Sequence, residues 1–343
     1  MVNYYIGADV HSNNVELAIE RNQRIVQRHS LPTSIRALRE VLDSLGGRTH
    51  LTFEEGPLAG WLYRHLKDHV DVLVVCDPRR NKLVSVDGDK DDRIDATKLA
   101  TLLRGNFLRP VHHSDDLQRL WLKRWVAVYH DRVRAATRAI NKIRALARLE
   151  GQRVPRRVLH DRLARQSWLD TLEANLAEAL SLRCRSYDRH RTEVHAAKRQ
   201  MMRRGRTFPI IAFWQALPGV GPVRATTLFA YLDTPWRFQK KSQLCKYCGV
   251  GLERTGSGKD RHGRDRPPRL ELFWKVNRRL KDAVMGMTLS AIRSRDNVFR
   301  AYYEERVRHG ALAGNARHAT ARKMLTVMWG MWKTSRPFDA AWC

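Results

Sequence analysis

Four acidic side chains stand where they could hold divalent metal ions. Asp9 lies in an apolar run near the start of the chain, and Glu54 ends a second apolar run. Asp92 and Asp95 are three residues apart, a spacing that places two side chains on one face of a helix. Mg²⁺ binds a few carboxylates together with waters and phosphate oxygens. Two such ions about 4 Å apart can hold the attacking and the leaving oxygen of a phosphodiester. The four residues therefore predict a two-ion Mg²⁺ site for phosphodiester chemistry.

Two neighbouring acids fit this site less well. Glu55 would point to the opposite side of a strand from Glu54, because successive side chains alternate. Asp91 would lie about 100° around a helix from Asp92. Asp9, Glu54, Asp92 and Asp95 therefore remain the candidate catalytic and metal-binding set.

The elements that must position these acids alternate between strand and helix signals over residues 1–110. Residues 11–14 read as a hairpin turn between the first two strands. The chain order predicts strands at residues 4–10, 15–20, 25–30, 50–54 and 70–76, with helices at residues 35–45 and 58–67 and a last helix headed by Asp92. Three meandering strands followed by helices and parallel strands is the order of a ribonuclease-H-like (RuvC-like) sheet. We therefore predict an α/β catalytic domain at residues 1–110.

Residues 111–206 read as basic helices. Apolar residues recur there at steps of four and three, which predicts a coiled-coil seam. The seam comprises Leu122, Val126, Tyr129, Val133, Ala136, Ile140 and Ile143. Arginine and lysine fill the other faces; these could be solvated, but their self-repulsion favours a surface for nucleic acid. A bend at residues 150–155 should lead into one returning helix that includes Trp168, Leu169, Leu172, Leu176 and Leu180.

Residues 207–343 are predicted to form a mainly helical domain. Residues 217–225 carry a helix-hairpin-helix signature, in which Gly219 and Gly221 form the turn and Arg224 follows. Backbone amides at such a turn and at the next helix N-terminus can hold a phosphate. The alternative is an ordinary turn between helices. Tryptophans 214, 236 and 274 are interpreted as core residues rather than as platforms for base stacking.

Ser257 lies between two glycines, and Arg254 and Lys259 flank this segment. Glycines let a backbone approach a phosphate closely and leave the serine hydroxyl exposed. A serine nucleophile needs activation by a metal ion or a base. A P-loop is excluded, because Glu253 and Asp260 stand where that motif needs glycine and Ser or Thr. Composition alone would make this stretch a flexible basic loop.

The composition points to a polyanionic partner. The chain has 343 residues, a formal net charge of +29 and a pI near 10.8. A membrane surface is the competing polyanion, but the sequence has no apolar stretch of transmembrane length and no signal peptide. We therefore expect a soluble, cytoplasmic or nucleoid-associated protein.

The cysteines and a histidine pair carry weaker signals. Five cysteines with irregular spacing favour reduced thiols. Cys245 and Cys248 have the spacing of half a zinc site, but no second pair follows, so buried structural thiols are favoured. His112 and His113 read as a loop pair without a partner carboxylate.

Taken together, these features resemble the DEDD insertion-sequence transposases with a catalytic serine, the bridge-RNA-guided recombinases. The resemblance covers nearly the whole chain. The blocks that carry it are Ile-Gly-Ala-Asp-Val-His at residues 6–11, Phe-Glu-Glu-Gly-Pro at residues 53–57 with Tyr63-Arg64, Lys-Asp-Asp-Arg-Ile-Asp-Ala at residues 90–96, the hairpin at residues 217–225, and residues 247–252 followed by Ser257-Gly258. Asp91, Gly256 and residues 264–268 depart from the family pattern.

The resemblance implies a chemistry and a set of partners. The acidic tetrad would bind Mg²⁺ and position a scissile phosphate, and Ser257 would attack it to give a phosphoserine link to DNA. A structured noncoding guide RNA would pair with donor and target DNA. Residues 207–343 would be the transposase domain that carries the serine. The acids and the serine would meet between subunits of a homo-oligomer, expected to be a tetramer.

Two other classes of function stay open. The first is a Holliday-junction resolvase-like two-metal nuclease, in which water attacks and Ser257 is incidental. The second is a non-catalytic nucleic-acid-binding protein whose acids are structural.

Overall fold

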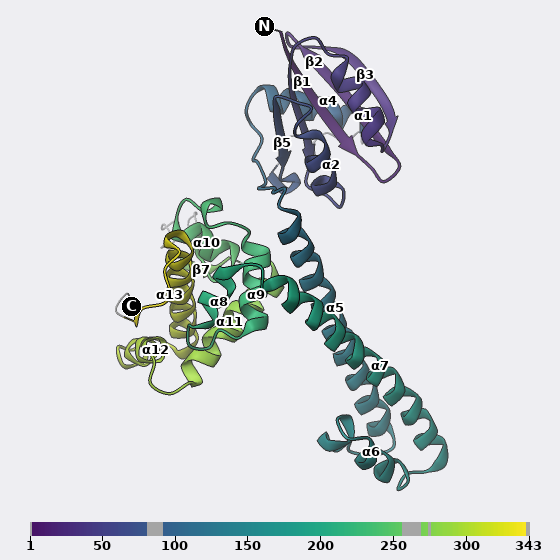
Figure 1. The fold of residues 1–343 in the computed structure, drawn as a ribbon, viewed down its shortest axis with the longest axis vertical. Helices are drawn as coiled ribbons and strands as arrows, with labels where there is room; N and C mark the ends of the chain where they lie inside the picture. Colours follow the sequence, from purple (N-terminus) through teal and green to yellow (C-terminus); the bar gives the residue numbers. More distant parts are fainter. Residues whose placement is uncertain (1, 81–91, 256–268, 274–275, 341–343) are drawn as a thin grey trace, which may run out of the picture. The chain divides into compact units, whose positions relative to one another are not determined.

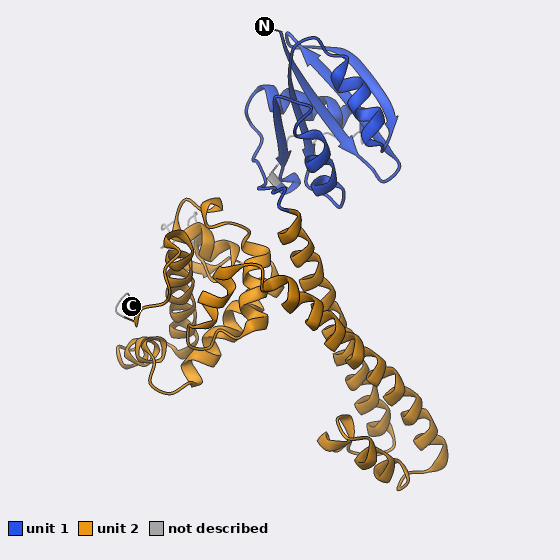
Figure 2. Ribbon diagram, viewed as in Figure 1, with its two compact units in different colours: residues 1–116 blue, residues 117–343 orange. Residues whose placement is uncertain are grey.

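The computed structural model describes residues 2–80, 92–255, 269–273 and 276–340. The chain divides into two compact units, residues 1–116 and residues 117–343 (Figure 2). The further division of the second unit into a middle and a C-terminal domain at residue 206 stays a prediction.

A five-stranded mixed sheet forms the first unit (Figure 1). Its strand order is β3-β2-β1-β4-β5. The strands span Asn3–Val10 (β1), Asn14–Arg21 (β2), Arg24–Pro32 (β3), Arg48–Glu54 (β4) and Val72–Cys76 (β5). β1, β2 and β3 pair antiparallel, whereas β4 pairs parallel with both β1 and β5. The predicted strands and their order are confirmed, and the unit is of mixed α/β type.

One face of this sheet packs against two short helices, α1 (Ile35–Asp43) and α2 (Ala59–Leu66). Side chains alternate along a strand, so Ile6 and Ala8 of β1 point into this core. A short 3-10 helix, η1 (Pro78–Arg80), follows β5.

The other face of the sheet packs against α4 (Asp92–Arg104) at very short range. Gly7 makes this approach feasible. A Cβ atom on Gly7 would lie 2.5 Å from the Ala100 nitrogen and would also overlap the Ala96 carbonyl oxygen. The backbone of α4 therefore rests directly on β1, which fixes where the first turn of the helix lies relative to the end of the strand.

Two long helices form a hairpin in the second unit: α5 (Leu117–Leu149) and α7 (Ala174–Gly205). Between them come η2 (Arg156–Leu159) and α6 (Arg162–Leu169). The prediction of one returning helix was wrong. Asp161 caps α6, and the Glu173 carboxylate accepts hydrogen bonds from the amides of Asn175 and Leu176, which starts α7 as a separate helix.

The buried face of α5 also differs from the predicted seam. Leu122, Val126 and Ile143 are buried as expected. In the middle of the helix, however, Ala135 and Ala139 are buried, whereas Val133, Ala136 and Ile140 are only half-buried. Small side chains thus occupy the buried positions in the middle of α5.

The remaining helices pack around one large apolar core, which also includes Leu122 and Val126 of α5. Trp214 lies at its centre, where its indole N–H donates to the Met328 carbonyl oxygen. The elements are α8 (Pro209–Gln215), α9 (Pro222–Leu232), η3 (Pro235–Arg237), α10 (Lys241–Tyr247), β6 (Leu252–Thr255), β7 (Arg269–Leu272), α11 (Arg278–Arg293), α12 (Val298–Arg308) and α13 (Ala313–Thr334). The region is thus mostly helical, with one antiparallel strand pair, β6 and β7.

The tryptophan predictions had different outcomes. Trp214 is a core residue as predicted. The prediction was wrong for Trp236, which is 71% exposed. Trp274 lies outside the described residues.

We expect Gly7→Ala to separate α4 from β1, because the new methyl group would overlap backbone atoms that cannot move independently. The substitution should lower the free energy of unfolding by about 1–3 kcal/mol or more, measured by urea denaturation. Gly46→Ala is the matched control, since a Cβ there meets nothing within 4 Å. Equal stability of the two variants would contradict the close contact.

Candidate metal centre

The last residues of β1 direct Asp9 toward the first turn of α4. Gly7 faces α4, and Asp9, two residues further along the strand, lies on the same side of the sheet. Asp92 and Asp95 both stand in the first turn of α4. The close contact at Gly7 therefore brings acids from two elements to one edge of the sheet.

Three potential ligand groups meet at this edge: Asp9, His11 and Asp92. The His11 Nε2 atom lies 3.0 Å from Asp9 Oδ2 and 3.4 Å from Asp92 Oδ2. One ligand atom from each residue lies within 4.8 Å of the others. Asp9 is 23% exposed, whereas Asp92 is 52% exposed, so the group opens to solvent. A phosphate oxygen could reach it directly.

The electrostatics at this edge reflect crowded negative charge. Burial raises the pKa of the Asp9 carboxyl, the hydrogen bond from His11 lowers it, and the charges of Asp92 and Asp95 raise it again. The hydrogen bond with Asp9 in turn raises the pKa of His11, against its partial burial. A cation is thus favoured where these carboxylates converge, and the imidazole supplies part of that compensation.

Asp95 lies one turn along α4 from Asp92 and is half-buried. The charge of Asp95 raises the pKa of Asp9, although Asp95 is not one of the three grouped residues. It is placed to add negative potential to the site.

Glu54 ends β4, the parallel neighbour of β1. The register pairs Ala8 with Phe53, so Asp9 and Glu54 are the next residues of the two strands. Phe53 belongs to the core beneath α1 and α2, and alternation directs Glu54 to the α4 side. Glu54 and His11 also line a cavity of about 180 Å³. All four predicted acids therefore belong to elements that converge at one sheet edge, while the three-residue grouping includes only two of them.

His11 is the residue of this group that the sequence prediction missed, since it had been assigned only to a turn. The turn does exist: the His11 amide donates to the Asn14 carbonyl oxygen. The available signal was its position two residues after Asp9, which can return a side chain to the same side of the strand.

Glu55 lies apart from the grouped acids. Its carboxylate contacts His113 Nε2 at 2.5 Å. The expectation that His112 and His113 lack a partner carboxylate was therefore wrong.

The predicted serine segment follows β6. Ser257 and Lys259 lie outside the described residues, as does Asp91. The strands on either side are described: β6 pairs antiparallel with β7, and Thr255 faces Arg269 in the last pair. Arg254, in β6, is exposed.

The predicted helix-hairpin-helix turn joins α8 to α9. Gly219 adopts a φ of +81°, and a Cβ there would overlap the Ala291 nitrogen of α11, so only glycine fits. Gly221 caps α9. Arg224 donates to Ser290 Oγ at 2.9 Å and thereby ties the turn to α11. The contact of this turn with nucleic acid stays a prediction.

The cysteines of the described region are free thiols, and all four are buried. Cys245 and Cys248 lie in the C-terminal core, where burial raises the pKa of both thiols. Neither belongs to a group of three potential metal ligands within the described residues. Their burial agrees with a structural role.

A mixed sheet whose edge gathers carboxylates and a histidine in a strongly basic chain has the features of a metal-dependent enzyme acting on nucleic acid. Two family models match the sequence. Residues 6–149 match the DEDD model of IS110, described as "Transposase", and residues 213–304 match the model described as "Transposase IS116/IS110/IS902 family". The chain therefore carries IS110-family transposase domains.

These domains support a DNA transposase of an insertion sequence, with DNA as its substrate and divalent metal ions in use. No curated protein matches the sequence. None of the described helices is both long enough and apolar enough to cross a membrane.

We expect Mg²⁺ to raise the melting temperature of the protein, because an ion that binds only the folded state stabilises it. At an ion concentration of 100 times the Kd the gain is about 2.7 kcal/mol. Asp9→Asn and Asp92→Asn should lose this shift in a thermal melt, whereas Glu55→Gln should keep it. A full shift in Asp9→Asn would show that the metal binds elsewhere.

A separate expectation concerns His11, which holds the Asp9 carboxylate through a hydrogen bond. Residues that orient a metal ligand typically contribute 10–100-fold to metal affinity. His11→Ala should therefore weaken Mg²⁺ binding by about this factor in a calorimetric titration. His29→Ala, on β3, is the control. An unchanged affinity in His11→Ala would mean that Asp9 needs no such partner.

Proposed function

We propose that the protein is an insertion-sequence recombinase that joins DNA strands through a serine nucleophile and Mg²⁺. Asp9, Glu54, Asp92 and Asp95 hold the ions, two of them, against the scissile phosphate. The observation that carries this proposal is the convergence of Asp9 and Asp92 at one sheet edge, inside the region that matches the DEDD transposase model.

The bound ions supply charge stabilisation to the phosphodiester and lower the pKa of an attacking hydroxyl. The chain itself contributes orientation. Asp9 is held by β1 and by His11, and Asp92 and Asp95 are held by the first turn of α4. The partial exposure of Asp92 leaves room for a DNA backbone.

Ser257 is the proposed nucleophile. Its Oγ gives up a proton and forms a bond to phosphorus, a phosphorus–oxygen bond of the DNA strand breaks, and the departing DNA oxygen takes up a proton to become a hydroxyl. Attack by a hydroxyl of a second strand then reverses these changes and releases the serine. The phosphoserine link to DNA retains the free energy of the broken phosphodiester bond, so strands exchange without net hydrolysis.

A structured guide RNA is the second proposed partner, and it selects donor and target DNA by base pairing. The cationic α5/α7 hairpin supports this proposal. Near the far end of α5, a cavity of about 960 Å³ is lined by arginines together with a few apolar side chains. The arginines are Arg144, Arg148, Arg153 and Arg156. Such a surface suits phosphate oxygens, which arginine can bind through two parallel hydrogen bonds.

The assembly is proposed to be a homo-tetramer, in which the acids of one subunit serve the serine of another. The proposed contacts to the nucleic-acid backbone are Gly219, Gly221, Arg224, Arg254 and Lys259. Arg254 is exposed on β6, and Gly221 caps a helix N-terminus, where a phosphate is stabilised.

A two-metal nuclease of the Holliday-junction resolvase type is the second candidate. One observation favours it: the grouped carboxylates and His11 belong to the first unit alone, and hydrolysis by water needs no residue of the second unit.

The Ser257→Ala variant distinguishes the two candidates. We expect it to abolish both the covalent protein–DNA product and the joined strands in a recombination assay with labelled DNA. Ser242→Ala, an exposed serine of α10, should behave as wild type. Strand cleavage that persists without Ser257 would overturn the serine mechanism in favour of water, and Asp9→Asn should abolish cleavage under either mechanism.

Guidance by RNA has a test of its own. We expect the expressed protein to co-purify with a discrete RNA encoded beside its gene, and we expect ribonuclease treatment to abolish strand exchange. RNA that is heterogeneous in sequence, together with full activity after ribonuclease, would contradict this part of the proposal.

A further inference from the structure

Trp236 is an exposed indole in an otherwise buried neighbourhood. The residues on both sides of it in the chain are more buried: Pro235 is buried and Arg237 is half-buried. Trp236 itself is 71% exposed. A single exposed apolar side chain is normal on a protein surface, so the case for a binding site rests on how this ring is held and on what surrounds it.

The backbone that carries Trp236 is fixed by hydrogen bonds from two directions. The Thr234 hydroxyl oxygen accepts a hydrogen bond from the Trp236 amide and caps η3. The Trp329 indole N–H of α13 donates to the Pro235 carbonyl oxygen at 2.9 Å. The ring is therefore presented from a turn that is tied to α13.

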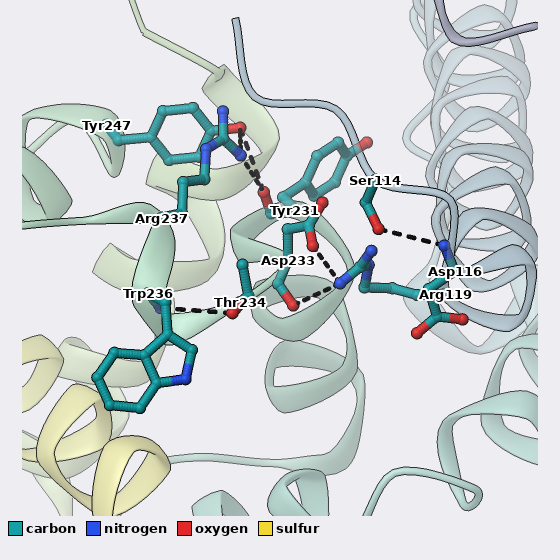
Figure 3. A network of polar contacts seen from close by, with 9 residues as sticks. All are labelled: Ser114, Asp116, Arg119, Tyr231, Asp233, Thr234, Trp236, Arg237 and Tyr247. Carbon is teal, nitrogen blue, oxygen red and sulfur yellow. Dashed lines mark hydrogen bonds and ion pairs between the residues drawn. The ribbon is translucent and has the colours of Figure 1, made fainter. Parts of the chain in front are cut away.

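A second set of contacts braces the ends of this turn (Figure 3). Arg119 of α5 forms an ion pair with Asp233, and it also donates to the Asp233 carbonyl oxygen at 2.8 Å. On the other side, Arg237 donates to the Tyr231 carbonyl oxygen and to the Tyr247 hydroxyl. Figure 3 shows the Trp236 indole directed away from the Arg119–Asp233 pair. A turn held in this way loses little conformational entropy when a ligand binds.

Positive charge lies beside the ring. Lys333 Nζ lies 5.2 Å from the Trp236 ring centroid and 3.7 Å from that of Trp329. Within the part of the chain that the structure describes, Lys333 forms no ion pair with a carboxylate. Lys240 and Lys241, a few residues further along the chain, are exposed. The surface thus combines an exposed aromatic ring, over which Lys333 lies, with two further exposed lysines.

We propose that Trp236 is a platform on which an unpaired nucleobase stacks, while Lys333 binds the phosphate beside that base. Every base has a flat π face, so an aromatic side chain binds single strands with little regard to sequence. The adjacent lysine favours a ligand that carries negative charge next to its ring, as a nucleotide does and an apolar protein side chain does not. Strand exchange exposes such unpaired bases. The inference rests on nucleic acid as the partner and is independent of the serine nucleophile and of the guide RNA.

The test compares a short oligothymidylate with the same strand bearing abasic sites, which keeps the phosphates but removes the bases. Stacking on an aromatic side chain typically accounts for about 5- to 150-fold in affinity per base. We expect the full-length protein to prefer the base-bearing strand by a factor in this range, measured by fluorescence anisotropy at fixed salt. Trp236→Ala should bind both strands equally, and Trp236→Phe should restore most of the preference.

Two further variants separate stacking from charge and from folding. Trp121→Ala removes another exposed indole, which lies on α5 with Arg124 4.6 Å from its ring, and it should leave the preference unchanged. Lys333→Ala should weaken the binding of both oligonucleotides equally. It should also reduce the salt dependence of binding by the amount expected for about one phosphate contact. Oligouridylate and oligothymidylate, run in parallel, show whether the unpaired base belongs to RNA or to DNA.

Three outcomes would overturn the inference. Trp236→Ala could keep the wild-type preference for bases. It could lose affinity for both strands to the same degree, which would indicate an effect on folding or on phosphate contacts. Finally, it could change the mass of the assembly in light scattering with no effect on base preference, which would assign the ring to a protein interface.

Discussion

The contact between α4 and β1 is the constraint on which the candidate metal centre depends. Gly7 has no side chain, so the helix backbone lies against the strand, and acids from the two elements converge without long or flexible side chains. An aspartate side chain is short, so the position of its carboxylate is set by the position of its backbone and by the choice of one rotamer. The position of a metal ion would therefore be set by main-chain packing in the sheet and in the helix start, two of the more rigid parts of a fold.

Positive and negative side chains have different functions in this protein. The chain has a formal net charge of +29, yet the sheet edge gathers acids, and burial together with the charges of Asp92 and Asp95 raises the pKa of Asp9. Basic side chains elsewhere attract a polyanion over long range, where the interaction weakens with salt. The acids act only at contact distance, through an ion that links them to the phosphate. Attraction and chemistry thus use charges of opposite sign on separate elements.

Much of the first unit could be predicted because strands with one buried face alternate visibly, and the strands found follow the predicted order. Asp9 and Asp92 were identifiable from their elements. His11 was missed: its position two residues after Asp9 was the available signal, but its contact with Asp92, which is remote in sequence, could not be seen in a local pattern. Local patterns also failed for Trp236, whose apolar neighbours suggested a core although the ring turns outward at η3. On α5 the heptad pattern did not show that alanines occupy the buried positions in the middle of the helix.

The single helix α5 belongs to two cores. Leu122 and Val126 pack in the large C-terminal core, whereas Ile143 and Ala147 pack in the hairpin with α7. At 33 residues the helix is roughly 50 Å long, and each residue turns it by about 100°. The orientation of the arginine-lined cavity about the helix axis is therefore fixed relative to the helical core at the other end. A single inserted residue would rotate the cavity relative to the core by more than a quarter turn. The length of this helix can therefore change only by nearly whole turns, and α7 must change by the same length.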